Sequence, residues 1–266
     1  CIDGKTMRSN TRNGSKPNHI VSAWCKEDGY CLGQKSVEEK SNEITAIPEV
    51  LDKINIRNQI VTIDAMGTQT AIAEKIRSKR GDYVLALKGN QSSLYEDMRL
   101  YFADKDVLRE IQKTGHYNRR AEKAHGQTEV REYYQIDDIH WLHQRSKWKG
   151  LKTVILEKKT IKRGESETVE YRYFISSLAP DILLASRAVR GHWAVESMHW
   201  HLDVTFKEDA NTTLDKISAQ NLNIIRKWSL SILKLLDIRG VKMSLRRKRF
   251  NIGMGPVKYL EEILKL

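Results

Sequence analysis

Several features that mark particular protein classes are scarce or missing in this sequence. Its 266 residues include only three cysteines, Cys1, Cys25 and Cys31, and they form no Cys-x-x-Cys pair. An odd number without such a pair indicates neither a disulfide framework nor a thiolate zinc site. No apolar run approaches the roughly 18 residues that a membrane span needs, and no basic-then-apolar leader opens the chain. We therefore expect reduced, mostly buried thiols in a cytoplasmic protein that has no membrane partner.

Basic residues outnumber acidic ones. Lysine and arginine total 46 against 34 aspartates and glutamates, which gives a formal charge of +12 and a pI near 9.5. Such a field favours polyanions, nucleic acid above all, although charge alone does not separate a DNA enzyme from a ribosomal or membrane-surface protein. The 40% hydrophobic content is enough to bury a core, as one large domain or as a core with an insertion.

Three acidic residues far apart in the chain stand in distinctive surroundings. Asp3 and Asp64 follow strand-like apolar runs and are expected where those strands end. Glu196 belongs to a predicted helix over residues 188–207, which contains no proline. Together the three carboxylates predict a divalent-metal site.

The predicted helix has two faces. At three- and four-residue steps it presents a polar stripe of His192, Glu196, His199, Asp203 and Lys207. Another face carries Trp193, Trp200 and Val204, and core packing is the simplest role for its two tryptophans.

The order of elements predicts a mixed α/β fold. Strands over 19–25 and 30–34, joined through Asp28-Gly29, predict an antiparallel meander with the opening strand. The elements expected next are a helix over 41–54 interrupted by Pro48, the strand before Asp64, a helix over 68–79, a strand over 83–88 and a helix over 93–103.

The middle of the chain has a different character. After a highly charged stretch over 109–123, strands are expected over 131–136, 153–157 and 169–176, around a polar hairpin at 162–165. We interpret this region as a β-rich insertion before the Glu196 helix. A last helix over 222–238 is expected to turn Trp228, Ile232 and Leu235 inward.

The chain opens with Cys1, two residues before Asp3. Strands commonly run about five or six residues, so a strand that ends at Asp3 would begin earlier. We therefore expect a fragment that lacks part of a central element.

Six motifs spread over nearly the whole chain carry a family resemblance. They are Ile2-Asp3-Gly4-Lys5, Ser41-Asn42-Glu43-Ile44, the run from Ile63 to Gln69, Leu87-Lys88-Gly89-Asn90-Gln91, His125-Gly126-Gln127-Thr128-Glu129, and Arg190 to Glu196 continued through His199-Trp200-His201-Leu202-Asp203-Val204. With them the sequence resembles the H-repeat-associated insertion-sequence transposases of bacteria.

The resemblance implies an α/β, RNase H-like mixed sheet flanked by helices, with a β-rich insertion before the last catalytic helix. It places the core in residues 1–105 and 181–266 and the insertion in 106–180. Asp3, Asp64 and Glu196 would be the catalytic DDE triad that binds two Mg²⁺ or Mn²⁺ ions. The implied activity is cleavage and strand transfer of double-stranded DNA, at element ends and target, by a homodimer on DNA.

Two departures from the wider group concern DNA contacts. Relatives usually carry a tyrosine and an arginine shortly before the catalytic glutamate and a lysine after it, whereas here Arg190 lies six residues before Glu196 without a nearby tyrosine, and Lys207 lies eleven residues after it. The second departure is Gln127, which stands where an arginine is more usual. The DNA-binding candidates are Lys88, Arg131, Arg190, Lys207, Arg246, Arg247, Lys248 and Arg249; for the last four, a solvated charge run is the alternative.

Simpler roles stay open for each site residue. Asp64 could cap the helix near Thr68, Asp3 could belong to an Asp-Gly turn, and Glu196 could be a solvated helix residue, although its place between two tryptophans argues against full exposure. Zinc bound by His192, Glu196 and His199 is a further alternative, but the His-Glu-x-x-His order is missing.

Three other functions compete with transposition. They are a truncated, catalytically inactive DNA-binding remnant, a metal-dependent nuclease of the same fold, and a zinc hydrolase as the outlier. Whether the protein joins DNA ends or only cuts them separates the nuclease from the transposase.

Overall fold

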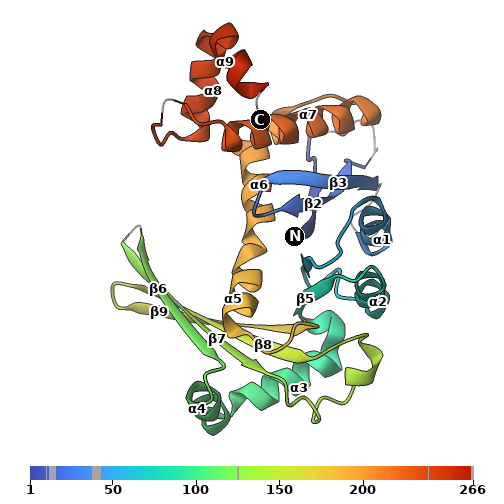
Figure 1. Ribbon diagram of the computed structural model, residues 1–266, viewed down its shortest axis with the longest axis vertical. Coiled ribbons are helices and arrows are strands. Elements are labelled where there is room, and N and C mark those ends of the chain that lie inside the picture. The colour runs from blue at the N-terminus through green and yellow to red at the C-terminus, as the bar shows by residue number, and fades with distance from the viewer. Residues whose placement is uncertain (10, 12–15, 38–42, 125, 239, 265–266) are drawn as a thin grey trace. The chain divides into compact units, whose positions relative to one another are not determined.

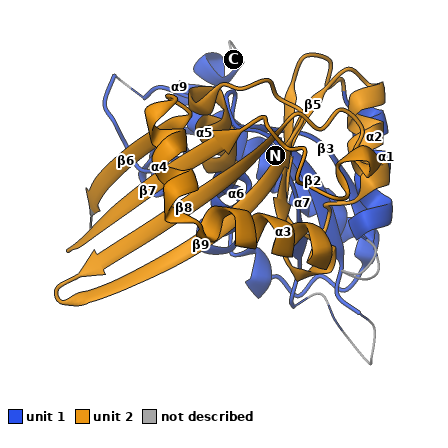
Figure 2. Ribbon diagram, turned by 90° about the horizontal axis from the view of Figure 1, so that it is seen from below, with its two compact units in different colours: residues 1–54, 193–266 blue, residues 55–192 orange. Residues whose placement is uncertain are grey.

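The computed structural model describes residues 1–9, 11, 16–37, 43–124, 126–238 and 240–264 (Figure 1). These residues form two compact units, which are coloured separately in Figure 2. Unit 1 comprises residues 1–54 and 193–266, and unit 2 comprises residues 55–192. Among the described helices, none is long and apolar enough to cross a membrane.

Unit 1 contains the predicted antiparallel meander. Strands β1 (Ile2–Thr6), β2 (His19–Cys25) and β3 (Tyr30–Val37) pair in sequence order, and Gly29 supplies the positive φ of 70° in the β2–β3 turn. The meander is confirmed, but the prediction that a strand ends at Asp3 is wrong, because β1 continues to Thr6.

The first helix of unit 1, α1 (Glu43–Lys53), contains Pro48. The expected interruption is wrong, because the helix runs through the proline. Buried Ala46, Ile47, Val50 and Leu51 hold it in place and offset the missing backbone donor. Residues 41 and 42 of the predicted helix lie outside the described part of the chain.

The other described elements of unit 1 are helical. They are α6 (Trp193–Val204), the 3₁₀ turn η4 (Glu208–Ala210), α7 (Lys216–Leu235), α8 (Leu245–Met254) and α9 (Pro256–Ile263). One core cluster joins Trp24 of β2 to Val195, Met198 and Leu202 of α6 and to Leu230 of α7. This packing holds α6 and α7 over the meander.

Helix α7 turns a different face inward from the one predicted. Trp228 is 65% exposed and Leu235 is exposed as well, whereas Asn223 and Lys227 are buried. The periodicity of apolar residues misled the prediction because the buried face is partly polar. Trp200 of α6 is also exposed, so its expected core role is wrong, while Trp193 is half-buried.

Unit 2 holds six strands of a mixed sheet. Its strands, in spatial order, are β4 (Ile60–Ile63), β5 (Asp82–Leu87), β9 (Ser166–Ser176), β8 (Thr153–Arg163), β7 (Gln127–Ile136) and β6 (Tyr117–Ala124). The β4–β5 pair is parallel and the remaining pairs are antiparallel. The predicted insertion strands are present but longer, and Gly164 turns the hairpin with a φ of 56°.

Helices and short turns complete unit 2. They are α2 (Thr70–Ser78), η2 (Gly89–Gln91), α3 (Ser92–Ala103), α4 (Lys105–Lys113), η3 (Arg145–Lys147) and α5 (Ile182–Gly191). The prediction missed α4 and β6, because both overlap the charged stretch over 109–123. Strand β6 is the outer strand of the sheet, where charged side chains are common.

The helix predicted over 188–207 is two helices. Helix α5 ends at Gly191, His192 lies between, and α6 runs only to Val204. Lys207 has a left-handed φ of 53° outside the helix, so it leaves the predicted polar stripe. The three cysteines are free, as expected, but half-buried rather than buried.

Candidate active site

Asp3 is the second residue of β1 and faces the helix that carries Glu196. It pairs with Ser22 of β2, and Ser22 pairs with Gln34 of β3, so the three side chains share one face of the meander. The Asp3 Oδ1 atom accepts a hydrogen bond of 2.9 Å from the Gly4 N–H, and its Oδ2 lies 3.6 Å from Nδ1 of His199 on α6. Because Asp3-Gly4 lies within a strand, the alternative of an Asp-Gly turn is wrong.

Asp64 directly follows β4 in unit 2. Its Oδ1 accepts a hydrogen bond of 3.2 Å from the Gly67 N–H. Helix α2 begins later, with Gln69 at its N-cap and no side-chain capping bond, so Asp64 is not the cap. The hydroxyl of Thr68, which has a single proton to donate, lies 2.6 Å from the Ala86 carbonyl and 3.1 Å from the Asp64 carbonyl, and so ties the loop after β4 to β5.

Glu196 lies in the first turn of α6 in unit 1. Its side chain is exposed, so the argument from the flanking tryptophans is wrong. His199 follows it by one turn on the same helix and contacts Asp3. Within unit 1 the structure therefore brings Asp3 to the helix of Glu196, while Asp64 belongs to unit 2.

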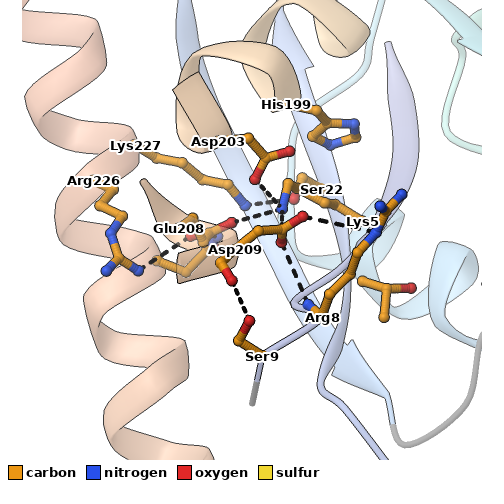
Figure 3. A network of polar contacts seen from close by, with 12 residues as sticks. Lys5, Arg8, Ser9, Ser22, His199, Asp203, Glu208, Asp209, Arg226 and Lys227 are labelled. Carbon is orange, nitrogen blue, oxygen red and sulfur yellow. Dashed lines mark hydrogen bonds and ion pairs between the residues drawn. The ribbon is translucent and has the colours of Figure 1, made fainter. Parts of the chain in front are cut away.

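A largely buried lysine lies two residues after Asp3, on the same face of β1. The Lys5 Nζ lies 2.7 Å from Oδ1 of Asp203, 3.2 Å from Oε2 of Glu208 and 3.1 Å from Oδ1 of Asp209 (Figure 3). Burial alone would lower the pKa of Lys5, but the Asp203 hydrogen bond and the three carboxylate charges outweigh it and raise that pKa. Lys5 therefore stays charged at neutral pH.

Helix α7 adds two further cations to these surroundings. Arg226 Nη1 lies 3.4 Å from Oε1 of Glu208. Lys227 is buried and donates to Ser22 Oγ at 2.6 Å and to Gln34 Oε1 at 2.7 Å, beside Asp3 in the same row. Desolvation lowers the pKa of Lys227.

A buried His–Glu pair lies on the opposite face of β1. Nε2 of His19 is 2.6 Å from Oε1 of Glu43, and a hydrogen bond of 2.8 Å joins its Nδ1 to Thr6 Oγ1. A Cβ atom at Gly4 would clash with the side chains of both partners, so any other residue there would displace the pair. Carboxylate oxygens of Glu43 and Asp3 lie within 4.8 Å of one another.

The sequence did not identify Lys5 and Glu43 as residues that lie beside Asp3. Both fall inside the quoted motifs Ile2-Asp3-Gly4-Lys5 and Ser41-Asn42-Glu43-Ile44. The motifs were the only available signal, because the partners of both residues are distant in the sequence.

The histidines of the zinc alternative are engaged with other groups. His192 Nδ1 lies 3.0 Å from Thr62 Oγ1, and burial lowers the pKa of His192 to about 4. His199 Nδ1 lies beside Asp3. These contacts give no support to a zinc site built from His192, Glu196 and His199.

The basic candidates of unit 2 differ in exposure. Lys88 is exposed at the start of η2, and Arg190 is half-buried on α5. Arg131 is buried, with its guanidinium 2.6 Å from Glu129 and 2.8 Å from Glu157. Its charge therefore faces two carboxylates in the sheet.

The basic run of unit 1 lies on α8. Arg246 and Arg247 are exposed. Lys248 donates to the Leu233 and Leu236 carbonyls at 2.9 and 2.5 Å, and so satisfies acceptors at the C-terminus of α7. Arg249 is exposed and donates to the Thr205 carbonyl.

Known sequences resemble the chain over nearly its whole length. Residues 1–232 match the family described as "Transposase DDE domain". The YncI protein of Escherichia coli O157:H7 is 37% identical over 274 residues, which cover 99% of this chain and 68% of that protein. The H repeat-associated YhhI protein of E. coli K12 is 35% identical over 278 residues, which cover 99% and 70%. Both proteins carry the word transposase in their names.

A solved structure shares the fold. The piggyBac transposase, in a cryo-EM synaptic complex with hairpin DNA, aligns with a TM-score of 0.50 and 11% identity, over 100% of this chain and 53% of that one. The likeness confirms the predicted mixed α/β, RNase H-like architecture. On the family match and its relatives, the chain belongs to the transposase DDE-domain family, among the H-repeat-associated transposases.

Proposed function

We propose that this chain is a DNA transposase in which Asp3, Asp64 and Glu196 bind two Mg²⁺ or Mn²⁺ ions and catalyse strand cleavage and strand transfer. The observation that carries the proposal is the position of Asp3. In a chain of the transposase DDE family, Asp3 lies inside β1 with its carboxylate toward α6, and α6 carries Glu196.

The donor set fits hard divalent cations. Three carboxylates offer only oxygen ligands, which Mg²⁺ and Mn²⁺ prefer. Asp3, within β1, and Asp64, in the loop directly after β4, each have one carboxylate oxygen oriented by a backbone N–H, of Gly4 and of Gly67. When bound, two ions would activate the attacking oxygen and stabilise the leaving oxygen of an in-line phosphoryl displacement.

The same carboxylates can serve both steps of transposition. With water as the attacking group the product is a nicked strand, and with a DNA 3′-hydroxyl it is a joined strand. Neither step needs a covalent enzyme intermediate. The chain's task is therefore to hold three carboxylates in place and to orient the DNA, which agrees with the fixed Asp3 and Asp64.

Double-stranded DNA is the partner in this proposal. The net charge of +12 supports it, as does the piggyBac transposase, whose solved structure is a synaptic complex with hairpin DNA. We place the contacts at Lys88, Arg190, Lys207, Arg246 and Arg247. Arg131, Lys248 and Arg249 have partners within the protein, so we leave Arg131 out and give the other two a supporting role.

Two expectations from the family complete the proposal. Pairing of two element ends would bring two copies of the chain together, so we propose a homodimer on DNA. We also keep residues 106–180 as an insertion between the core segments 1–105 and 181–266.

The test is the substitution Asp64→Asn. The substrate is a supercoiled plasmid that carries the gene of this chain with its native flanks, incubated with Mg²⁺ or Mn²⁺. We expect nicked and linear products to fall roughly 100-fold or more, because metal-ion catalysis supplies several kcal/mol. Salt-sensitive DNA binding, measured in EDTA by mobility shift, should stay near that of the wild type.

Asp106→Asn is the matched control, because Asp106 is an exposed aspartate on α4 of the same unit. It should cleave like the wild type. Unchanged cleavage by the Asp64→Asn protein would reject the metal assignment. Cutting without any joined product would favour the nuclease of the same fold.

A further inference from the structure

The Lys5 cluster consists of Lys5, Asp203, Glu208 and Asp209. Figure 3 shows the lysine ammonium among the three carboxylates, at the distances of 2.7 to 3.2 Å given above. Lys5 and Glu208 are largely buried, with 10% and 0% of their side chains exposed, and the two aspartates are about one-third exposed. None of the four residues is a proposed metal ligand.

The cluster joins the same two elements that carry Asp3 and Glu196. Lys5 follows Asp3 by two residues, so both side chains lie on one face of β1. Asp203 follows Glu196 by seven residues, or two turns, and lies on the same side of α6. An ion pair between Lys5 and Asp203 therefore links β1 to α6, two residues from Asp3 and two helical turns from Glu196.

Glu208 connects the cluster to a further element, helix α7. Its Oε1 accepts a hydrogen bond of 2.9 Å from Asn223 of α7 and lies 3.4 Å from Arg226, while its Oε2 faces Lys5. Asp209 also accepts from the Arg8 backbone N–H, and its carbonyl accepts from Ser9 Oγ. The segment after β1 is thus tied to η4 as well.

This arrangement accepts only one register of β1. A slip of one residue would turn Lys5 to the opposite face and leave three carboxylates facing a strand without a cation. Packed apolar side chains would stabilise the contact as well as buried ions do, but they tolerate small shifts. The ionic contact between β1 and α6 is therefore suited to fixing position.

We propose that Lys5, Asp203, Glu208 and Asp209 are positioning residues that set the spacing between Asp3 and Glu196 and thereby the metal affinity of the site. The inference rests on the proposed function, because it assumes that Asp3 and Glu196 bind the metal. It assigns a role to four residues that are not among the proposed metal ligands or DNA contacts.

The test uses the two partly exposed members, because their loss leaves the buried Glu208 paired. The variants are Asp203→Asn and Asp209→Asn in the 266-residue chain. The measured quantity is the Mn²⁺ concentration that gives half-maximal plasmid nicking, with the melting temperature recorded alongside. We expect that concentration to rise roughly 10-fold, as when outer partners of metal ligands are removed.

Glu49→Gln is the matched control. It breaks the Lys35–Glu49 pair of unit 1, which has the same 2.7 Å length but joins β3 to α1. It should leave the Mn²⁺ requirement unchanged. A merely structural role of the Lys5 cluster would lower the melting temperature and the maximal rate without moving the half-maximal Mn²⁺ concentration.

The two levels of the proposal fail in different ways. An unchanged Mn²⁺ requirement in both cluster variants, or loss of folding in both, would overturn the positioning role while Asp64→Asn still abolishes nicking. Nicking that survives in the Asp64→Asn protein would overturn the proposed function itself.

Discussion

Each unit of the molecule contains an ion network centred on a largely buried cation, and the two networks connect the chain in different ways. In unit 2, Arg131 of β7 bridges Glu129 on its own strand and Glu157 on β8, 26 positions away. In unit 1, Lys5 of β1 bridges carboxylates such as Asp209, 204 positions away. One network joins neighbouring strands, and the other joins distant segments.

The difference concerns what else holds the partners together. Strands β7 and β8 already share a hydrogen-bonded ladder from Thr128 to Ile136, so the Arg131 network adds stability to a geometry that the backbone sets. Strand β1 and helix α6 share no such ladder, and their contact is made by side chains. Loss of Arg131 should therefore lower the stability of the fold. Loss of the Lys5 cluster should lower stability and also let β1 shift relative to α6.

The largest effect on stability is expected from Arg131→Met. It would leave Glu157, which is 1% exposed, without its cation, although the Tyr133 hydroxyl still donates to it at 3.0 Å. Breaking a buried pair from one side costs about 3 kcal/mol, which corresponds to a fall in melting temperature of roughly 6–12 °C. Thermal unfolding followed by circular dichroism measures it.

The control for that variant is Arg163→Met, an exposed arginine of β8 that donates to Gln127. Its melting temperature should match that of the wild type. The Arg131→Met protein should also keep the wild-type Mn²⁺ dependence of nicking. A changed Mn²⁺ requirement would erase the distinction between the two networks.

Glu208→Gln should have the next largest effect. The amide keeps the shape of the side chain but removes the charge that faces Lys5 and Arg226, at a cost of about 1–3 kcal/mol for a buried, charge-assisted contact. Unlike Arg131→Met, it should raise the Mn²⁺ requirement. Melting and nicking curves on the same preparation test both statements, and a purely thermal effect would contradict the second.

Acidification should have opposite effects on the stability that one carboxylate of each network, Glu129 or Asp203, contributes. Burial alone would raise the pKa of Glu129, but the hydrogen bond and charge of Arg131, with Lys159, outweigh it and lower that pKa below 4.5. Its stabilising contribution is present above pH 4.5 and is lost as the pH falls through the lowered value. Burial raises the pKa of Asp203 above 3.8 more than Lys5 lowers it, so its contribution favours folding at low pH and is lost as the pH rises through the raised value.

Hydrogen exchange, corrected for intrinsic rates, can follow both regions. Between pH 5.5 and pH 3, amides of β7 and β8 should lose protection before those of α6. Loss of protection in α6 first would show that the charges of Glu129 and Asp203 do not control these regions.

The sequence predicted local structure better than it predicted the surroundings of the site. Asp3 and Asp64 could be proposed as site residues because each lies within or directly after a short apolar run, and Glu196 because its motif is distinctive. The meander followed from Asp28-Gly29 and its flanking strands. In each case the signal lies within a few residues.

Features that depend on distant partners were not predictable in the same way. Lys5 finds Asp203 only after two elements from opposite ends of the chain pack together. Lys227 looks like a surface residue in the sequence, yet it is buried because Ser22 and Gln34 accept its hydrogen bonds. The inward face of α7 was therefore assigned to Trp228, which is exposed.

The smallest effect is expected from an exposed pair in the β8–β9 hairpin. Lys162 and Glu167 lie 2.8 Å apart, with 56% and 48% of their side chains exposed, on strands that pair next to Gly164. Because water and salt screen such a pair, Glu167→Gln should change the free energy of unfolding by less than about 0.5 kcal/mol, and less still in high salt. Denaturant titrations at low and high salt measure this difference. A loss of unfolding free energy as large as that of Arg131→Met would mean that distance, rather than burial, controls the strength of these ion pairs. The contrast between the two networks would then depend on their geometry alone.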